Sequence, residues 1–290
     1  MTSWTWQYVN SPLASHGLNL GLHLLLAGAV LGLAYRIGLR SFGLWAVGVI
    51  WLLHPLNVET VAYAASRGEL LAAIGVVGAC VLACGAWWRW LTLAGIVSCL
   101  GLAVLSKESG VVGLLLVPFV IACRRVHAPV PRWLPAVVAL GLLGVGIERY
   151  GGLRAVVNMG TTDFVHATSI TWVQWVGTQA AATRHWLWAA IAFEGLTLDP
   201  DLDAVTVLGR IWSVGLLGLL AAWAWLARRD VPIVAFGVGF LLLGLLPRFV
   251  VQTPQSYLSA HQFTVPWIGP VLMAGWGMTR LAQWADGGTT

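Results

Sequence analysis

The densest group of chemically capable side chains lies in the segment HPLNVETVAYAASRGEL, residues 54–70. It contains an imidazole, a guanidinium and two carboxylates: His54, Arg67, Glu59 and Glu69. Such groups support acid–base chemistry and phosphate binding, and they adjoin apolar runs in which an isolated charge costs at least about 2.5 kcal/mol. On a continuous helix Glu59 and Arg67 would lie about 80° apart. The segment therefore predicts either a structural Glu59–Arg67 pair or one wall of a polar substrate pocket.

A second polar segment, SHGLNLGLH, places His16, Asn19 and His23 at i, i+3 and i+7 on one stripe of a helix. Three interpretations are open: hydrogen bonds between helices, a functional role beside His54, or ligation of a haem by His23. The sequence shows no second histidine stripe at a matching depth. We therefore predict no cofactor and no metal ion.

Two shorter segments, SKESG and SAHQFTVPWIGP, also interrupt the apolar sequence. The first contains Lys107, the single lysine of the chain, beside Glu108. Its compact ammonium suits an anionic lipid phosphate or a neighbouring carboxylate. The second places His261 and Gln262 just before a helix that begins near a proline. For both segments, structural and ligand-binding roles are open.

The composition places these groups in a membrane protein. Of the 290 residues, 59% are hydrophobic and 9% are charged, and the mean hydropathy is +0.82. In a typical soluble protein roughly a quarter of all residues are charged, and these residues cover much of its surface. The basic residues are scattered, with no run that would follow a phosphate backbone, which excludes nucleic-acid binding. The four cysteines lie in apolar segments without a C-x-x-C pair, so we expect them to pack in the interior.

Long apolar segments predict a single membrane domain over residues 1–290, an all-α, polytopic transmembrane bundle of about nine spans. The predicted spans are 16–36, 42–56, 69–88, 90–106, 109–123, 133–148, 205–227, 232–250 and 264–281. Arginines beside one set of helix ends indicate the cytoplasmic face. We expect a bacterial inner-membrane protein with its N-terminus outside and its C-terminus in the cytoplasm.

Residues 149–204 form an extracytoplasmic stretch that begins and ends outside in this topology. Its Trp-rich part predicts a helix lying in the membrane interface, with tryptophans at headgroup level, and a re-entrant hairpin is the alternative. The tryptophans concerned are Trp172, Trp175, Trp186 and Trp188.

Together these segments resemble the membrane domain of the GT-C superfamily, in the branch of the transmembrane and tetratricopeptide-repeat O-mannosyltransferases and their bacterial relatives. The family's H-x-x-N-x-x-x-H stripe, its H-P-x-x-x-E-x-V-x-x-x-x-x-R-x-[DE]-L pattern and its K-E pair match His16, Asn19, His23, His54, Pro55, Glu59, Val61, Arg67, Glu69, Leu70, Lys107 and Glu108. The late E-[RH]-R-x-Y-x-P-x-x-G motif is partly retained as Ala260, His261, Gln262, Thr264, Pro266 and Gly269. The resemblance covers roughly residues 12–270.

The resemblance implies an outward cavity that binds a polyprenyl-phosphate-linked sugar and transfers it to an acceptor. A carboxylate would act as general base, and cations would hold the departing phosphate. The candidate bases are Glu59, Glu69 and Asp163. The candidate phosphate ligands are Arg67, Lys107 and Arg149, and the remaining predicted substrate-binding residues are His16, Asn19, His23, His54, Glu108 and His261.

Two classes of function are open. The family's catalytic acids lie in a first outer loop, and we expect this chain to begin downstream of that loop. The late motif also carries Ala260 and Gln262 in place of a Glu and an Arg. The chain is then either a glycosyltransferase that uses another acid or a degenerate GT-C scaffold within a larger membrane complex. The expected partners are membrane lipids, the lipid-linked sugar and, for a scaffold, other integral membrane subunits, but no nucleic acid.

Overall fold

The computed structural model describes residues 12–85, 89–123, 144, 171–196, 206–250 and 259–286. Within these ranges the chain forms helices joined by turns and contains no β-strand, which confirms the all-α class for this part. The elements are α2 (Pro12–Arg36), α3 (Ser41–Leu53), η1 (Pro55–Asn57), α4 (Val58–Ala62), η2 (Ala64–Ser66), α5 (Arg67–Ala83), α6 (Arg89–Ser106), η3 (Glu108–Val112), α7 (Gly113–Cys123), α10 (Trp172–Ala192), α11 (Val207–Ala227), α12 (Pro232–Val250), η4 (Ala260–Phe263) and α13 (Thr264–Ala285).

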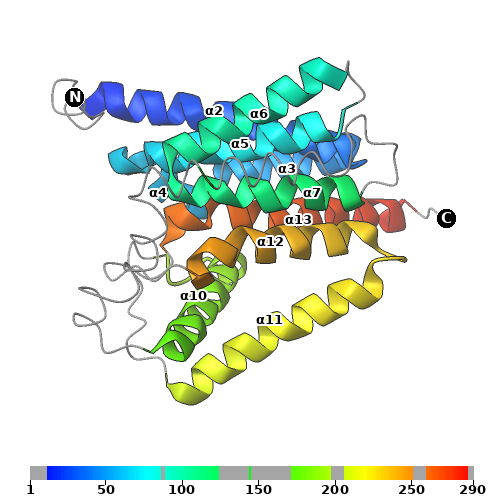
Figure 1. The fold of residues 1–290 in the computed structure, drawn as a ribbon. Helices are drawn as coiled ribbons and strands as arrows, with labels where there is room; N and C mark the ends of the chain where they lie inside the picture. Colours follow the sequence, from blue (N-terminus) through cyan, green and yellow to red (C-terminus); the bar gives the residue numbers. More distant parts are fainter. Residues whose placement is uncertain are drawn as a thin grey trace.

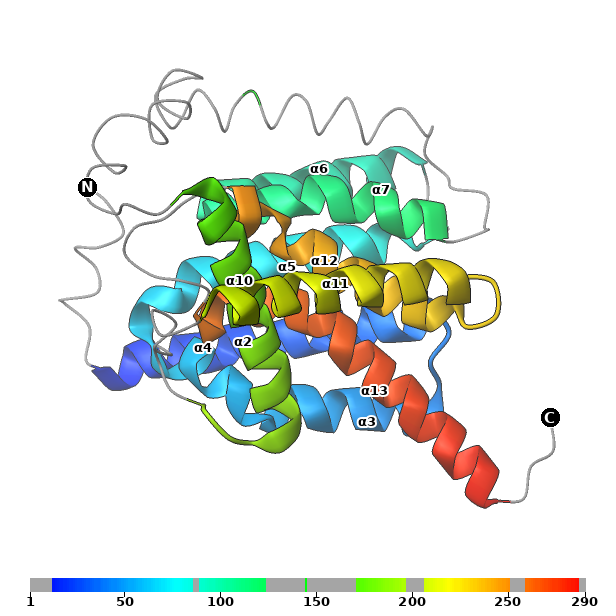
Figure 2. The ribbon, with the colours of Figure 1, turned by 90° about the horizontal axis from the view of Figure 1, so that it is seen from below.

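Helix α5 is the centre of the bundle. It packs against α2, α6 and α7, and Leu70, Val76, Val77 and Cys80 on it are fully buried. A helix that is apolar on every side is suited to this position because it has no face that requires water. Figure 1 shows α2, α3, α5, α6, α7 and α12 lying roughly along one direction, and Figure 2 shows α13 inclined across them.

Glycines allow the closest approaches between the helices. Gly269 of α13 faces Gly237 of α12, and a Cβ added at Gly269 would clash with the Gly237 carbonyl oxygen. Gly75 of α5 lies in the same way against the Cys99 carbonyl of α6. Small residues let helices pack backbone against backbone, and here they do so at the two most extensive helix interfaces, α5–α6 and α12–α13.

Three helical segments of the described ranges are long and apolar enough to cross a membrane, which indicates an integral membrane protein. They are Leu13–Arg36, Val207–Ala227 and Pro232–Phe249. A fourth span results if Ser41–Leu53 and Pro55–Ala62, which are bent by 48°, are counted as one.

The prediction of nine spans is not supported, because several apolar segments form short helices. Helices α3, α5 and α7 contain 13, 17 and 11 residues. At about 1.5 Å per residue, each is shorter than a hydrocarbon core of about 30 Å. Hydropathy identified the apolar runs but not the residues at which each helix ends. The predicted span 133–148 lies outside the described residues, apart from Gly144.

Helix α10 runs across the direction of α11 and α12 (Figure 2) and begins with a capping box at Thr171. Trp172 and Trp188 on α10 are exposed, whereas Trp175 and Trp186 are buried inside the protein. The placement of the four tryptophans at headgroup level stays a prediction. Whether α10 is interfacial or re-entrant stays a prediction, and most of 149–204 outside α10 is not among the described residues.

Charged side chains gather at two opposite ends of the bundle. The first, which we call the polar end, contains Asn19, Glu59, Arg67, Glu69, Lys107 and His261. The second, the basic end, contains Arg36, Arg40, Asp230 and Arg280. In Figure 1, α4 marks the polar end and the C-terminal end of α13 marks the basic end. The three arginines were predicted to share a face, and which face is cytoplasmic stays a prediction.

Candidate functional site

His54 fixes the corner where the chain leaves α3. Leu56 N–H donates to His54 Nδ1 (3.2 Å), so the proton must be on Nε2, which donates to the Ala190 carbonyl of α10 (2.9 Å). The imidazole also packs against the rings of Phe193 and Trp267, with centroids 5.2 and 5.0 Å away. Both ring nitrogens therefore serve the fold, and the substrate contact predicted for His54 would require one of these bonds to break.

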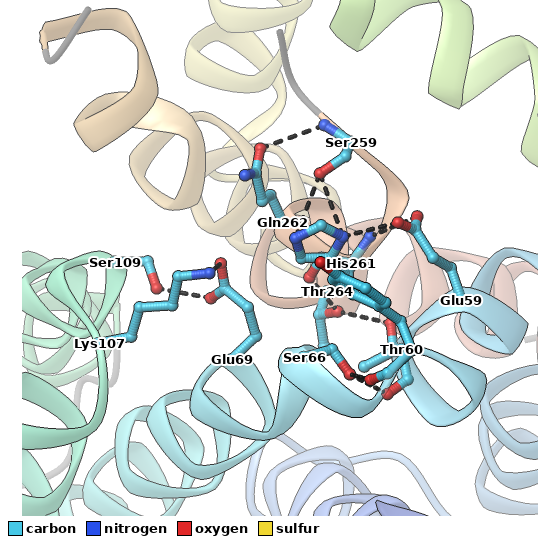
Figure 3. A network of polar contacts seen from close by, with 11 residues as sticks. Glu59, Thr60, Ser66, Glu69, Lys107, Ser109, Ser259, His261, Gln262 and Thr264 are labelled. Carbon is cyan, nitrogen blue, oxygen red and sulfur yellow. Dashed lines mark hydrogen bonds and ion pairs between the residues drawn. The ribbon is translucent and has the colours of Figure 1, made fainter. Parts of the chain in front are cut away.

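Glu59 on α4 and His261 on η4 form the first charged contact of the polar end (Figure 3). His261 N–H donates to Glu59 Oε2 (3.1 Å), and His261 Nδ1 lies 2.7 Å from Glu59 Oε1. Beside them, the hydroxyls of Thr60 and Thr264 lie 3.1 Å apart and share a hydrogen bond. The Glu59 and His261 side chains are 11% and 13% exposed, so the contact is largely shielded from water, where a charge-assisted hydrogen bond is strong.

The short η4 helix positions the His261 ring. Ser259 and Gln262 form a capping box, in which Ser259 N–H donates to Gln262 Oε1 (3.2 Å). Ser259 Oγ also lies 3.2 Å from His261 Nδ1 and 3.4 Å from its Nε2. The Tyr63 ring lies against the imidazole at a centroid distance of 5.6 Å. Gln262 therefore acts as a helix cap.

Among the described contacts, Arg67 does not pair with Glu59, which was one of the two sequence interpretations. That pairing assumed a continuous helix from Glu59 to Arg67. In the structure α4 ends after five residues, and the separate turn η2 precedes α5. The angle of about 80°, which holds for a continuous helix, therefore does not apply to Glu59 and Arg67. The Glu59 side chain contacts η4 instead.

Arg67 contacts Asn19, a fully buried residue of α2. Arg67 Nε donates to Asn19 Oδ1 (3.4 Å), while Asn19 Nδ2 donates to the carbonyls of Val61 (3.2 Å) and Tyr63 (3.1 Å). Asn19 thus joins α2 to the turn between α4 and α5. Within the described part of the chain, the two terminal guanidinium nitrogens of Arg67 have no hydrogen-bond or carboxylate partner.

The second charged contact of the polar end joins Glu69 of α5 to Lys107, which directly precedes η3 (Figure 3). Glu69 Oε1 lies 2.8 Å from Lys107 Nζ, as an ion pair whose angles fall outside hydrogen-bond geometry. Ser109 Oγ donates to Glu69 Oε2 (2.6 Å). The Glu69 side chain is 4% exposed and that of Lys107 is 22% exposed. The carboxylate is therefore closed off from a substrate hydroxyl, whereas the Lys107 side chain is partly exposed.

The predicted polar stripe of α2 separates into three environments. Asn19 belongs to the polar end, whereas His16 is exposed and makes no polar contact within the described ranges. His23 is buried and stacks on Trp51, with centroids 6.1 Å apart and planes 15° apart. Its Nδ1 has no hydrogen-bond partner. The stripe is therefore not one binding surface, and only Asn19 contacts another predicted site residue.

Some predicted site residues lie outside the described part of the structure: Arg149, Asp163 and the side chain of Glu108. Conversely, sequence reasoning missed a set of neutral residues that hold the charged ones: Thr60, Tyr63, Ser66, Ser109, Ser259 and Thr264. Their position in the sequence could have identified them, because most lie within two residues of a predicted charged residue or histidine. Within the described ranges, no three His, Cys, Asp or Glu side chains are grouped so that they could hold a metal ion.

Taken together, the polar end contains two carboxylates that already have partners and one cation that does not. Glu59 is held by His261 and Glu69 by Lys107, which leaves Arg67 with only the amide oxygen of Asn19 among the described residues. A comparison with family models, curated proteins and solved structures finds no match to this chain. The resemblance to the GT-C superfamily therefore stays a prediction from the sequence.

Proposed function

We propose that the polar end binds the phosphate of a lipid, either a polyprenyl-phosphate-linked sugar or a simpler lipid phosphate, at the expected outer face of the membrane. The observation that carries this proposal is the state of Arg67. Its guanidinium is only partly exposed and has two terminal nitrogens without a partner in the described structure. A partly buried cation without a counter-charge is costly, and a phosphate that accepts two parallel hydrogen bonds would remove that cost.

Lys107 supports the same proposal because its side chain lies against the first turn of α5, the helix that begins with Arg67. A Cβ added at Gly68, the residue after Arg67, would lie 3.8 Å from the Lys107 side chain. Glu69 occupies one side of the Lys107 ammonium, which carries three donors. Arg67 and Lys107 together would therefore approach one phosphate from two elements, α5 and the turn before η3. A headgroup there would keep its lipid chain alongside the exposed apolar faces of the bundle.

The proposal is tested by titrating the full chain, in phosphatidylcholine nanodiscs, with polyprenyl phosphate and with uncharged polyprenol. We expect Arg67→Gln to weaken polyprenyl phosphate binding about 10- to 100-fold, since a hydrogen bond to a charged group contributes about 1.5–3 kcal/mol. The matched control is Arg228→Gln, which removes an exposed guanidinium that stacks on Trp225. Equal binding of the phosphate and the alcohol by the unaltered chain would contradict the proposal.

A second candidate function, sugar transfer, is favoured by the Glu59–His261 contact. A carboxylate bound to Nδ1 orients an imidazole so that Nε2 can accept a proton from a substrate hydroxyl. In such a step the acceptor oxygen would form a bond to the anomeric carbon. The bond from that carbon to the phosphate oxygen would break, the polyprenyl phosphate would leave with the electron pair, and the hydroxyl proton would pass to His261. Glu59 would then be a positioning residue rather than the base predicted from the sequence.

The two candidates are separated by variants of the histidine. If the chain is a transferase, His261→Gln should lower sugar transfer from a polyprenyl-phosphate donor at least 100-fold, because a positioned base contributes about 10²- to 10⁴-fold. Donor binding should be retained, since Arg67 is unchanged. If the unaltered chain binds the lipid phosphate but transfers no sugar, binding is its function. If it does neither, the scaffold alternative is favoured.

A further inference from the structure

A cavity of about 1020 Å³ lies at the basic end, on the side of the bundle away from the proposed phosphate site. It is formed by the turn between α2 and α3, the turn between α11 and α12, and the C-terminal half of α13. Its volume is at the upper limit of ordinary small-molecule pockets, so it can hold a ligand much larger than one phosphate group.

Three guanidiniums from two elements line this cavity. Arg36 and Arg40 come from the α2–α3 turn and Arg280 from α13, whereas Asp230 is the one acidic residue among the described lining residues. No ion pair joins Asp230 to an arginine within the described residues, so the charges are not internally neutralised. The described lining residues therefore carry a surplus of two positive charges, which favours an anionic ligand.

The arginines retain free donors. Arg40 uses one terminal nitrogen for the carbonyls of Tyr35 (2.6 Å) and Leu39 (2.7 Å), and its guanidinium stacks on the Tyr35 ring. This anchors the group at the edge of the cavity with its other nitrogens unused. Arg280 makes one hydrogen bond, to Gln283 (3.3 Å), and Arg36 makes none within the described part. A phosphate can thus receive hydrogen bonds from several sides without breaking existing contacts.

The other wall of the cavity is apolar. Ile233 and Phe236 of α12 and Trp276 of α13 line it together with Leu39. A free phosphate or a sugar phosphate makes no use of such a wall, whereas a phospholipid places its glycerol and the start of its acyl chains there. Helix ends with basic residues also lie where headgroups lie in a bilayer, and basic pockets between membrane helices bind anionic headgroups.

We propose that the cavity at the basic end binds the phosphate headgroup of an anionic phospholipid. Arg36, Arg40 and Arg280 would hold the phosphate, and the apolar wall would receive the upper part of the acyl chains. This site is separate from the polar end, and its binding does not depend on the function proposed there.

The proposal is tested with the full chain in phosphatidylcholine nanodiscs to which phosphatidylglycerol is added, with retained lipid measured by native mass spectrometry. We expect the double variant Arg36→Gln/Arg280→Gln to lower the affinity for phosphatidylglycerol at least 10-fold. The matched control, Arg228→Gln/Arg229→Gln, removes the same charge from exposed residues outside the lining and should have less than a twofold effect.

Two outcomes would overturn the proposal. An equal loss in both double variants would mean that only the net charge of the protein attracts the lipid. Displacement of phosphatidylglycerol by millimolar inorganic phosphate would mean that the site takes a soluble anion. If the double variant does not fold, Arg280→Gln alone changes one exposed side chain and should still weaken binding several-fold, and no change in that variant would count against the proposal.

Discussion

Glu59 and His261 bind each other through two contacts, one to the backbone N–H and one to the ring, although 202 residues separate them in the sequence. The pair links two parts of the polar end. It joins α4, the short helix after α3 and η1, to η4, the turn that directly precedes the last helix, α13. The same contact leaves one ring nitrogen of His261 away from the carboxylate. One interaction is thus both a structural link and the basis of the proposed proton transfer.

Glu59→Ala should destabilise the protein by about 1–3 kcal/mol, because it removes the acceptor of a largely buried N–H and ring nitrogen. The control is Glu194→Ala, which removes an exposed carboxylate after α10 and should change the free energy of unfolding by less than about 0.5 kcal/mol. The free energy of unfolding is measured by denaturant titration in detergent micelles. Equal effects of the two variants would show that the Glu59–His261 contact contributes nothing.

Lys107→Met should destabilise the protein by about 3–5 kcal/mol, because it leaves the Glu69 carboxylate buried without its counter-charge. Glu69→Gln introduced into the same chain should restore most of that loss, since no buried charge then remains. A double-mutant cycle on the free energy of unfolding measures the coupling. Additive losses from the two changes would contradict the ion pair as the dominant interaction.

Gly269→Ala should lower stability by about 1–3 kcal/mol, because the added methyl group must push α13 away from the Gly237 carbonyl of α12. Gly277→Ala is a matched control on the same helix, since no atom lies within 4 Å of a Cβ placed there. That control should be neutral or slightly stabilising, because alanine is the better helix former. The two variants are compared by their thermal unfolding midpoints, and similar midpoints would argue against the close approach.

Asn19→Ala should loosen the turn between α4 and α5, because it removes the amide that donates to the Val61 and Tyr63 carbonyls and releases Arg67, although Ser66 still donates to Tyr63. Amide hydrogen exchange over residues 58–66 should become faster, and polyprenyl phosphate binding should weaken because Arg67 loses its anchor. His16→Ala, one turn earlier on the same helix and exposed, should change neither quantity. Unchanged exchange in Asn19→Ala would show that other contacts hold the turn.

The sequence predicted part of the group that meets at the polar end, although it also included His16, His23 and His54, which lie in other environments. Asn19, Glu59, Lys107 and His261 all lie near the ends of apolar runs, and alternating helix directions bring every second end to the same side. Composition likewise predicted helices and a membrane environment. These inferences required only the positions of charges relative to apolar runs.

The pairing of those charges and the number of spans could not be predicted in this way. A Glu59–Arg67 pair was one of two interpretations because a continuous helix would place both on one face, yet α4 ends at Ala62 and Glu59 binds His261. The spans were overcounted for a related reason, since an apolar run does not show where its helix stops. In each case the deciding features were local turns, whose geometry depends on contacts with distant segments such as η4 and α10.

The shortness of α3 has a consequence for the surrounding lipid. Its 13 residues extend about 20 Å, and Phe42, Trp45 and Val49 point outward along it. If α3 crosses the membrane without α4, a bilayer of about 30 Å is longer than this face, and the leaflets beside α3 would have to become thinner. The protein would then be more stable in bilayers of short-chain lipids. A change in membrane thickness would also change the angle between α3 and α4.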